Sequence, residues 1–376
     1  MIKFWSYKRE YDKYKDNFIK NIKKSLNRGN IFFGNELEKF EKSFVKKYKS
    51  KYGIAVGSGT DALLISLKAL DIKNGDEIIT AANTAIPTIS AIINSGATPR
   101  LVDIKNDYLI DCEKIEKLIN KKTKAIIPVH LYGQPCDIEK ITKIAKRNNI
   151  KVIEDCAQSQ GAQFKNKYVG TFGVFGCFSF YPTKILGAYG DGGFILTNDY
   201  KLYKKIKRMR FYGIETADKK NKFNNKYYAN ENGINSRLDE MQASILNFKL
   251  KKVDNFINRR IQISKIYLNE LRNTSLIMPK KNLFSKHVYH LFTVYHHKKN
   301  QIVKHLKNQK IETKVIYEFP IHKMKAYKKL KNNKNLKNSE IKSKGIFCLP
   351  IYPELKNKEI LKICNIIKKF LIRKNF

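Results

Sequence analysis

The stretch FGCFSFYPTKILGAYGDGG, residues 175–193, joins a short strand pattern to a lysine and a run of glycines. Lys184 follows Pro182, which favours an extended conformation for the preceding residue, Tyr181. The glycines let the backbone approach a ligand or another segment closely; they are Gly187, Gly190, Gly192 and Gly193. This setting distinguishes Lys184 from the many surface lysines of the chain and makes it a candidate for chemistry.

Strand-like and helix-like patterns alternate upstream of this stretch. Short apolar runs predict buried strands at residues 52–56, 77–80, 98–102, 125–129 and 152–155, with another at 193–197. Apolar residues at helical spacing predict helices at residues 1–29, 36–48, 86–94, 112–119, 138–148, 202–210 and 238–256. The alternation predicts an α/β domain whose parallel sheet is covered by helices. Ligands of such sheets bind at the carboxyl ends of the strands.

The pattern changes at about residue 257. A helix, a strand around residues 288–295 and short elements ending at 359–370 predict a smaller α+β domain. We therefore expect two domains, with residues 1–256 forming the N-terminal segment and the large domain and residues 257–376 forming the small one. The lysine- and asparagine-rich segment 328–337 is expected to be a mobile surface loop.

Two motifs lie where strands are expected to end. The turn Gly57-Ser58-Gly59-Thr60 leads into a helix, so it is either an anion site made of free N–H groups or an ordinary capped turn. In the second motif, Asp155 ends a strand, and it can cap a loop or pair with a cationic ring nitrogen. Gln158 lies about one turn further on, within reach of the same ligand.

The third motif is the opening stretch itself. Ser179 and Tyr181 share one face of the strand, so both hydroxyls can point toward the site that Lys184 enters. Burial or nearby positive charge would lower the pKa of the lysine and make it a nucleophile. A phosphate cradle, a carboxylate and a lysine in this order indicate a pyridoxal phosphate enzyme.

The composition argues against several other classes of function. The net charge of +42 is spread along the chain without a nucleic-acid-binding motif, so we expect a solvated basic surface and no specific nucleic-acid partner. No apolar run is long enough to span a membrane, and the scattered cysteines without a signal peptide predict reduced thiols in the cytoplasm. The histidines lack the clustering that zinc needs, so no metal site is expected.

Four segments together resemble the DegT/DnrJ/EryC1/StrS family of pyridoxal-phosphate-dependent nucleotide-sugar aminotransferases. They read GSGTDAL, EDCAQSQGAQF, VGTFGVFGCFSFYPTKILGAYGDGG and NGINSRLDEMQASIL, and PIHKMKAY and CLPIYPEL extend the likeness toward the C-terminus. The resemblance implies fold type I, with a mostly parallel seven-stranded sheet in the large domain. It also implies a homodimer with shared active sites that takes L-glutamate and a nucleotide-linked keto sugar.

The resemblance also assigns roles to individual residues. Lys184 would bind the cofactor covalently and move the proton, Asp155 would pair with the pyridine nitrogen, and Gln158 would contact the ring hydroxyl. The phosphate would be held by Gly59, Thr60 and Ser179, with Asn235 contributed by the second subunit. Tyr181 and His322 lie where residues that contact the substrate are expected.

Two positions depart from the family pattern. Ala85 stands where an aromatic side chain usually stacks on the cofactor ring, so another residue must cover the ring or the cofactor is held less tightly. Ile185 stands where asparagine commonly follows the lysine. Neither change removes a group that the chemistry requires.

The sugar carbon and the nucleotide stay open at this stage. The sequence around Tyr181 and Asp191 is similar to that of enzymes that aminate C-3 of dTDP-3-keto-6-deoxyhexoses. Enzymes that aminate C-4 more often carry histidine and glutamate at these two positions. Amination at C-3 of a UDP-linked keto-uronic acid is an alternative. A sugar dehydratase of the same family would carry histidine in place of Lys184, and a non-catalytic nucleic-acid-binding relative would not need Lys184, Asp155 and Gln158 together.

Overall fold

The computed structural model describes residues 1–215, 228–330 and 335–373. Its large sheet has seven strands in the order β1-β9-β8-β5-β4-β2-β3. The strands are β1 (Tyr52–Val56), β2 (Glu77–Ala81), β3 (Thr98–Val102), β4 (Thr123–Ile127), β5 (Lys151–Asp155), β8 (Phe175–Ser179) and β9 (Gly193–Thr197). Only β9 runs antiparallel to its neighbours, so the predicted mostly parallel seven-stranded sheet is confirmed.

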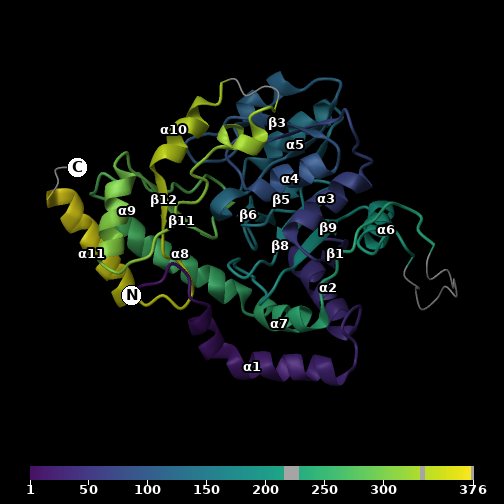
Figure 1. The fold of residues 1–376 in the computed structure, drawn as a ribbon, viewed down its shortest axis with the longest axis horizontal. Coiled ribbons are helices and arrows are strands. Elements are labelled where there is room, and N and C mark those ends of the chain that lie inside the picture. The colour runs from purple at the N-terminus through teal and green to yellow at the C-terminus, as the bar shows by residue number, and fades with distance from the viewer. Residues whose placement is uncertain (216–227, 331–334, 374–376) are drawn as a thin grey trace.

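Helices cover both faces of this sheet (Figure 1). They are α2 (Asn35–Tyr48), α3 (Gly59–Ala69), α4 (Ile86–Asn94), α5 (Ile138–Arg147), α6 (Tyr200–Met209) and α7 (Glu240–Leu250), with α1 (Tyr7–Asn27) outside α7. One buried core packs α2 and α7 against β8 and β9, and it includes Phe44 of α2, Phe178 of β8 and Phe194 of β9. A second core packs α3 and α4 on the sheet and includes alternate residues of the same strands, such as Cys177 of β8 and Ile195 of β9.

The C-terminal part is a smaller α+β unit. It contains α8 (Val253–Glu270), α9 (Lys299–Asn308), α10 (Lys337–Gly345) and α11 (Asn357–Arg373), together with the paired strands β11 (Phe292–Tyr295) and β12 (Ile346–Leu349). The small strands β6 (Gln163–Phe164), β7 (Lys167–Tyr168) and β10 (Ser285–Lys286) form a third sheet. The domain boundary at residue 257 stays a prediction, and α8 runs through it.

The first residues of the chain lie against the C-terminal unit, although they are distant from it in sequence (Figure 1). Ile2 pairs with Ile311 through backbone hydrogen bonds, and the Arg9 guanidinium pairs with Glu359 of α11 at 2.6 Å. Glu10 contacts Lys249 of α7 at 2.6 Å, and both side chains are buried. The N-terminal segment therefore connects the C-terminal unit to the helices of the large sheet.

Three predicted elements differ in detail. Residues 112–119 form two 3-10 turns, η1 (Cys112–Lys114) and η2 (Glu116–Leu118), because only Cys112 and Ile115 are buried and their spacing of three suits a 3-10 turn. The helix expected at 238–256 breaks after Leu250, because α7 packs on α1 and α2 whereas α8 packs on α11. The strand expected at 288–295 begins only at Phe292, since Tyr289 has a φ of 48°.

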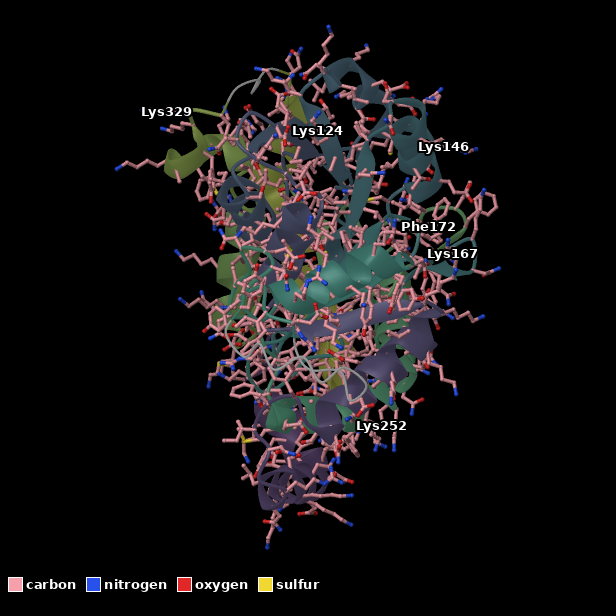
Figure 2. All side chains as sticks on the ribbon, turned by 90° about the vertical axis from the view of Figure 1, so that its right-hand side faces the viewer. Lys124, Lys146, Lys167, Phe172, Lys252 and Lys329 are labelled. Carbon is pink, nitrogen blue, oxygen red and sulfur yellow. The ribbon has the colours of Figure 1, made fainter. Side chains whose placement is uncertain are left out.

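Three further 3-10 turns are η3 (Leu131–Gly133), η4 (Ile321–Lys323) and η5 (Lys325–Tyr327). The surface loop predicted at 328–337 includes residues 331–334, which lie outside the described residues, and its last residue begins α10. None of the helices in the described part of the chain is long and apolar enough to cross a membrane. Figure 2 shows labelled lysines on widely separated elements, among them Lys124, Lys146, Lys252 and Lys329, so the positive charge covers much of the surface.

Glu154 of β5 is fully buried and fixes a turn beside the sheet. One carboxylate oxygen accepts hydrogen bonds from His130 Nε2 (3.1 Å) and the Gly170 N–H (2.8 Å). The other accepts from the N–H groups of Phe172 and Gly173, each at 2.7 Å. His130 Nδ1 accepts from the Cys136 N–H at 3.0 Å, so the proton is on Nε2 and the imidazole is neutral. The carboxylate therefore stabilises the fold by accepting four hydrogen bonds.

Replacing this carboxylate tests its structural role. We expect Glu154→Gln to lower the free energy of unfolding by about 3 kcal/mol, because the amide NH2 would face N–H donors in a buried place. Chemical denaturation of the cofactor-free protein would measure the loss. Glu116→Gln is the control, since its ion pair with Arg147 is exposed and should matter little. Equal losses in the two variants would contradict the assignment.

Candidate active site

The predicted anion turn lies against the end of β8. Ser58 caps α3 by accepting a hydrogen bond from the Asp61 N–H at 3.1 Å. A Cβ atom at Gly59 would lie 2.7 Å from the Cβ of Ser179, so only glycine allows this approach. Thr60 follows in the first helical turn. The N-terminus of α3 and the Ser179 hydroxyl are therefore neighbours, which is an arrangement suited to a phosphate.

Ser236 holds this turn in place, a role that sequence reasoning missed because the contact joins distant segments. Its hydroxyl accepts a hydrogen bond from the Gly57 N–H at 2.8 Å and donates one to Asp61 at 2.8 Å. Asn235, the preceding residue, is exposed and forms an isolated bridge with Phe211. The predicted contribution of Asn235 to a partner's phosphate site stays a prediction.

Asp155 ends β5 and is 4% exposed. One carboxylate oxygen accepts from Thr88 Oγ1 at 2.8 Å, and the other accepts from the Ala157 N–H at 3.1 Å. Burial raises the pKa of Asp155, although both hydrogen bonds and the charge of Lys184 favour the ionised form. A cationic ring nitrogen beside this carboxylate would stabilise its charge further.

Gln158 is held by two residues that sequence reasoning missed. Its Oε1 accepts from the Tyr132 N–H at 2.8 Å, and its Nε2 donates to the Tyr317 hydroxyl at 2.7 Å. Tyr132 and Tyr317 have φ angles of 58° and 63°, which bulky residues rarely adopt. Such backbone conformations cluster at functional sites. No local sequence pattern marks either tyrosine, because both contacts are tertiary.

Lys184 follows β8 in a turn closed by its own N–H, which donates to the Tyr181 carbonyl at 2.8 Å. Its side chain lines a pocket of about 510 Å3 together with Gln158, Tyr181 and His290. Burial lowers the pKa of Lys184 from 10.5 to about 8, while the nearby Asp155 acts in the opposite direction. About a fifth of the amine would therefore be neutral at pH 7.4, far more than for an exposed lysine.

The N-terminal segment forms another wall of the same pocket. Phe4, Trp5 and Tyr7 line it, and the Arg260 guanidinium lies 4.9 Å from the centroid of the Trp5 ring. The sequence pattern predicted a helix from the first residues of the chain, whereas α1 begins only at Tyr7. Their role in the pocket depends on the docking of residues 1–6 against the C-terminal unit.

Two other predicted positions are not among the described residues that line the Lys184 pocket. His322 is buried and contacts Glu340 of α10 through Nε2 at 2.9 Å, and it is not among the described residues that line the pocket. Ala85 caps the N-terminus of α4, three residues before Thr88. The predicted substrate contact of His322 stays a prediction and would require a rearrangement or a contribution outside this pocket.

Comparisons with known proteins show the family of the chain. The DegT/DnrJ/EryC1/StrS aminotransferase family model matches residues 12–368. A dTDP-3-amino-3,6-dideoxy-alpha-D-galactopyranose transaminase from Aneurinibacillus thermoaerophilus is 41% identical over 82% of this chain and 84% of that protein. A UDP-N-acetyl-3-dehydro-alpha-D-glucosamine 3-aminotransferase from Acidithiobacillus ferrooxidans is 35% identical over 95% of this chain and 94% of that protein.

A solved structure is similar over nearly the whole chain. The crystal structure of DesV from S. venezuelae, in complex with a ketimine intermediate, has a TM-score of 0.93 and 32% sequence identity, and it covers 98% of both chains. The predicted aminotransferase fold is confirmed by this likeness and by the seven-stranded sheet. The chain therefore belongs to the DegT/DnrJ/EryC1/StrS aminotransferase family.

Proposed function

We propose that this pyridoxal-phosphate-dependent sugar aminotransferase moves the amino group of L-glutamate to the C-3 keto group of a dTDP-3-keto-6-deoxyhexose. The observation that carries the proposal is the convergence of Lys184, Asp155 and the Gly59 turn at one edge of the sheet. The product would serve the biosynthesis of a surface glycan or an antibiotic sugar. The enzyme would work in the cytoplasm, in keeping with six buried cysteines that are free of disulfides.

The residues present fit pyridoxal phosphate. The missing Cβ at Gly59 leaves the N–H groups of α3 beside Ser179, where they and Thr60 would hold the phosphate. Asp155 would hold the ring nitrogen, and Gln158, fixed by Tyr132 and Tyr317, would contact the ring hydroxyl. When bound, the cofactor supplies an electron sink for the bond changes at the substrate carbon.

The side chains of this chain would supply proton transfer and charge control. The Lys184 amine, whose pKa burial holds at about 8, can both accept and release a proton near neutral pH, as a general acid–base group must. Asp155 would keep a proton on the ring nitrogen, because its carboxylate is fixed by Thr88 and Ala157 and faces Lys184. Tyr181 is half-exposed at the pocket and is free to contact the sugar.

The choice of C-3 depends on Tyr181 and Asp191, whose residue types are more typical of C-3 than of C-4 enzymes. The relative from A. thermoaerophilus is a transaminase of a dTDP-linked 3-amino sugar, and the relative from A. ferrooxidans is a 3-aminotransferase of a UDP-linked 3-dehydro sugar. Both relatives therefore support amination at C-3, but they differ in the nucleotide that the sugar carries. Amination at C-4, or at C-3 of a UDP-linked keto-uronic acid, is the alternative.

A homodimer with shared active sites is part of the proposal. Phe32, Phe33 and Tyr212 are exposed aromatic residues on the same surface as Asn235. The Arg237 guanidinium lies 4.4 Å from the centroid of the Phe32 ring, so it belongs to the same surface. Exposed aromatic clusters of this kind are typical of protein interfaces, so Asn235 of one subunit could reach the phosphate of the other.

The pKa of Lys184 predicts how cofactor capture varies with pH. Because only the neutral amine attacks a carbonyl, the capture rate of the cofactor-free protein should rise about tenfold per pH unit below pH 8 and level off above it. Stopped-flow absorbance between pH 6 and pH 10 would measure this rate. A rate that still climbs steeply above pH 9.5 would contradict the lowered pKa, and Lys184→Ala should show no covalent capture.

Product analysis tests the sugar carbon and the nucleotide. The purified protein is incubated with L-glutamate and, separately, with dTDP-3-keto, dTDP-4-keto and UDP-linked 3-keto sugars, and the products are identified by NMR. We expect a 3-amino sugar and 2-oxoglutarate from the dTDP-3-keto compound. Amination of only the 4-keto compound would contradict C-3, and a preference for the UDP-linked sugar would contradict dTDP.

A further inference from the structure

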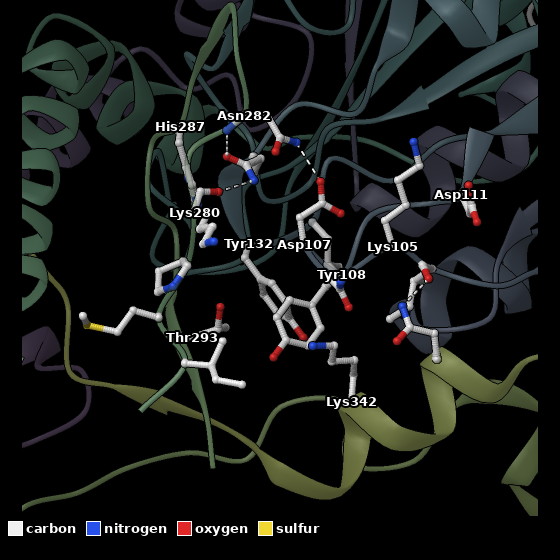
Figure 3. A pocket seen from close by; sticks show the side chains of 18 of the residues that line it. Lys105, Asp107, Tyr108, Asp111, Tyr132, Lys280, Asn282, His287, Thr293 and Lys342 are labelled. Carbon is white, nitrogen blue, oxygen red and sulfur yellow. Dashed lines mark hydrogen bonds between the residues drawn. The ribbon is translucent and has the colours of Figure 1, made fainter. Parts of the chain in front are cut away.

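A second cavity, of about 850 Å3, lies between the large domain and the C-terminal unit (Figure 3). Its walls come from the loop at residues 104–111, turn η3, the segment at residues 277–282, and α10. Lys184 and Asp155 are not among the described residues that line it. The volume falls in the range of small-molecule sites, which is about 300 to 1,000 Å3.

The carboxylates of this cavity are already engaged by its own walls. The two oxygens of Asp107 accept hydrogen bonds from Asn282 Nδ2 at 2.8 Å and from the Leu109 N–H at 3.1 Å. Asp111 accepts from the Glu113 N–H at 3.2 Å and lies 3.6 Å from the Lys114 ammonium. Both acidic groups therefore stabilise the frame of the cavity. Asp107 keeps its negative charge, but four lysines line the cavity against two carboxylates, so the lining is net positive.

Two lysines that line the cavity have no carboxylate partner in the described part of the chain. Lys280 and Lys342 come from opposite walls, and neither forms an ion pair with a carboxylate of the described chain. Figure 3 shows the Lys342 side chain rising from α10 toward Tyr108 and Tyr132. Its ammonium lies 5.3 Å from the centroid of the Tyr295 ring, a contact that orients the side chain without neutralising its charge.

The remaining lining combines apolar and amide side chains. Leu131, Ile277 and Met278 give apolar contact area. The Gln134 amide is already bonded to the Lys280 carbonyl and the Asn282 N–H, so Asn338 and Thr293 bring the polar groups of the lining. Such a lining suits a ring that carries hydroxyl groups, and the two lysines suit a phosphate attached to it. We propose that this cavity binds an organic phosphate the size of a sugar phosphate or nucleoside monophosphate, with Lys280 and Lys342 as the phosphate partners.

One residue that lines the cavity also contacts a residue of the catalytic pocket. Tyr132 lines the cavity, and its N–H holds Gln158 at 2.8 Å. The Tyr132 ring also lies 6.0 Å from the Tyr317 ring, which holds the other end of the Gln158 amide. A ligand that shifts Tyr132 would therefore alter Gln158, so its binding should also change the absorbance of the bound cofactor.

Calorimetric titration of the cofactor-loaded protein tests the proposal. The probes are thymidine monophosphate, glucose 1-phosphate and inorganic phosphate. The test variant is Lys280→Gln with Lys342→Gln, and the matched control is Lys281→Gln with Lys344→Gln. The control changes the net charge equally at exposed neighbours that do not line the cavity. Unchanged circular dichroism and thermal melting would show that both variants fold.

The number of binding sites decides the outcome, because a nucleotide can also enter the catalytic pocket. We expect the test variant to bind one equivalent per chain less of at least one organic phosphate than the wild type and the control, or to bind it at least about tenfold more weakly. Loss with thymidine monophosphate alone identifies a nucleoside phosphate, and loss with glucose 1-phosphate alone identifies a sugar phosphate. Equal binding by test and control variants, or binding of inorganic phosphate as tight as that of both esters, would overturn the proposal.

Discussion

Two neighbouring carboxylates at the carboxyl end of β5 form the constraint on which the structure of the site depends. Because side chains alternate along a strand, Glu154 and Asp155 point to opposite faces of the sheet. Glu154 is held by four donors from His130 and the turn at residues 170–173, which fixes the end of the strand. Asp155 is thereby presented, buried and rigid, to the pocket of Lys184.

The surrounding segments meet at this point for separate physical reasons. Gly59 lets the N-terminus of α3 approach Ser179, and Thr88 reaches Asp155 from the first turn of α4. The C-terminal unit contributes Tyr317 and His290, and the first residues of the chain contribute Trp5. The pocket thus requires the large sheet, the C-terminal unit and the N-terminal segment together. Disrupting the docking of any one of them would change the surroundings of Lys184.

Local pattern predicted most of the large sheet. The strands expected at 52–56, 98–102 and 193–197 have those bounds, because short apolar runs between turn residues leave little choice of register. The helix expected at 238–256 was interrupted, since its two halves pack on different partners. Thr88, Tyr317 and Trp5 escaped sequence reasoning for a related reason: their contacts with the site join segments far apart in the chain.

The chain has a net charge of +42 and many lysines. The central claim is that one of them, Lys184, binds the cofactor covalently. Lys184 differs from the exposed lysines because burial lowers its pKa to about 8 beside Asp155. The most direct measurement is borohydride reduction of the cofactor-loaded protein, followed by mass spectrometry of its peptides. We predict that the retained cofactor is attached to Lys184 alone. Attachment spread over surface lysines, with Lys184 unmodified, would contradict it.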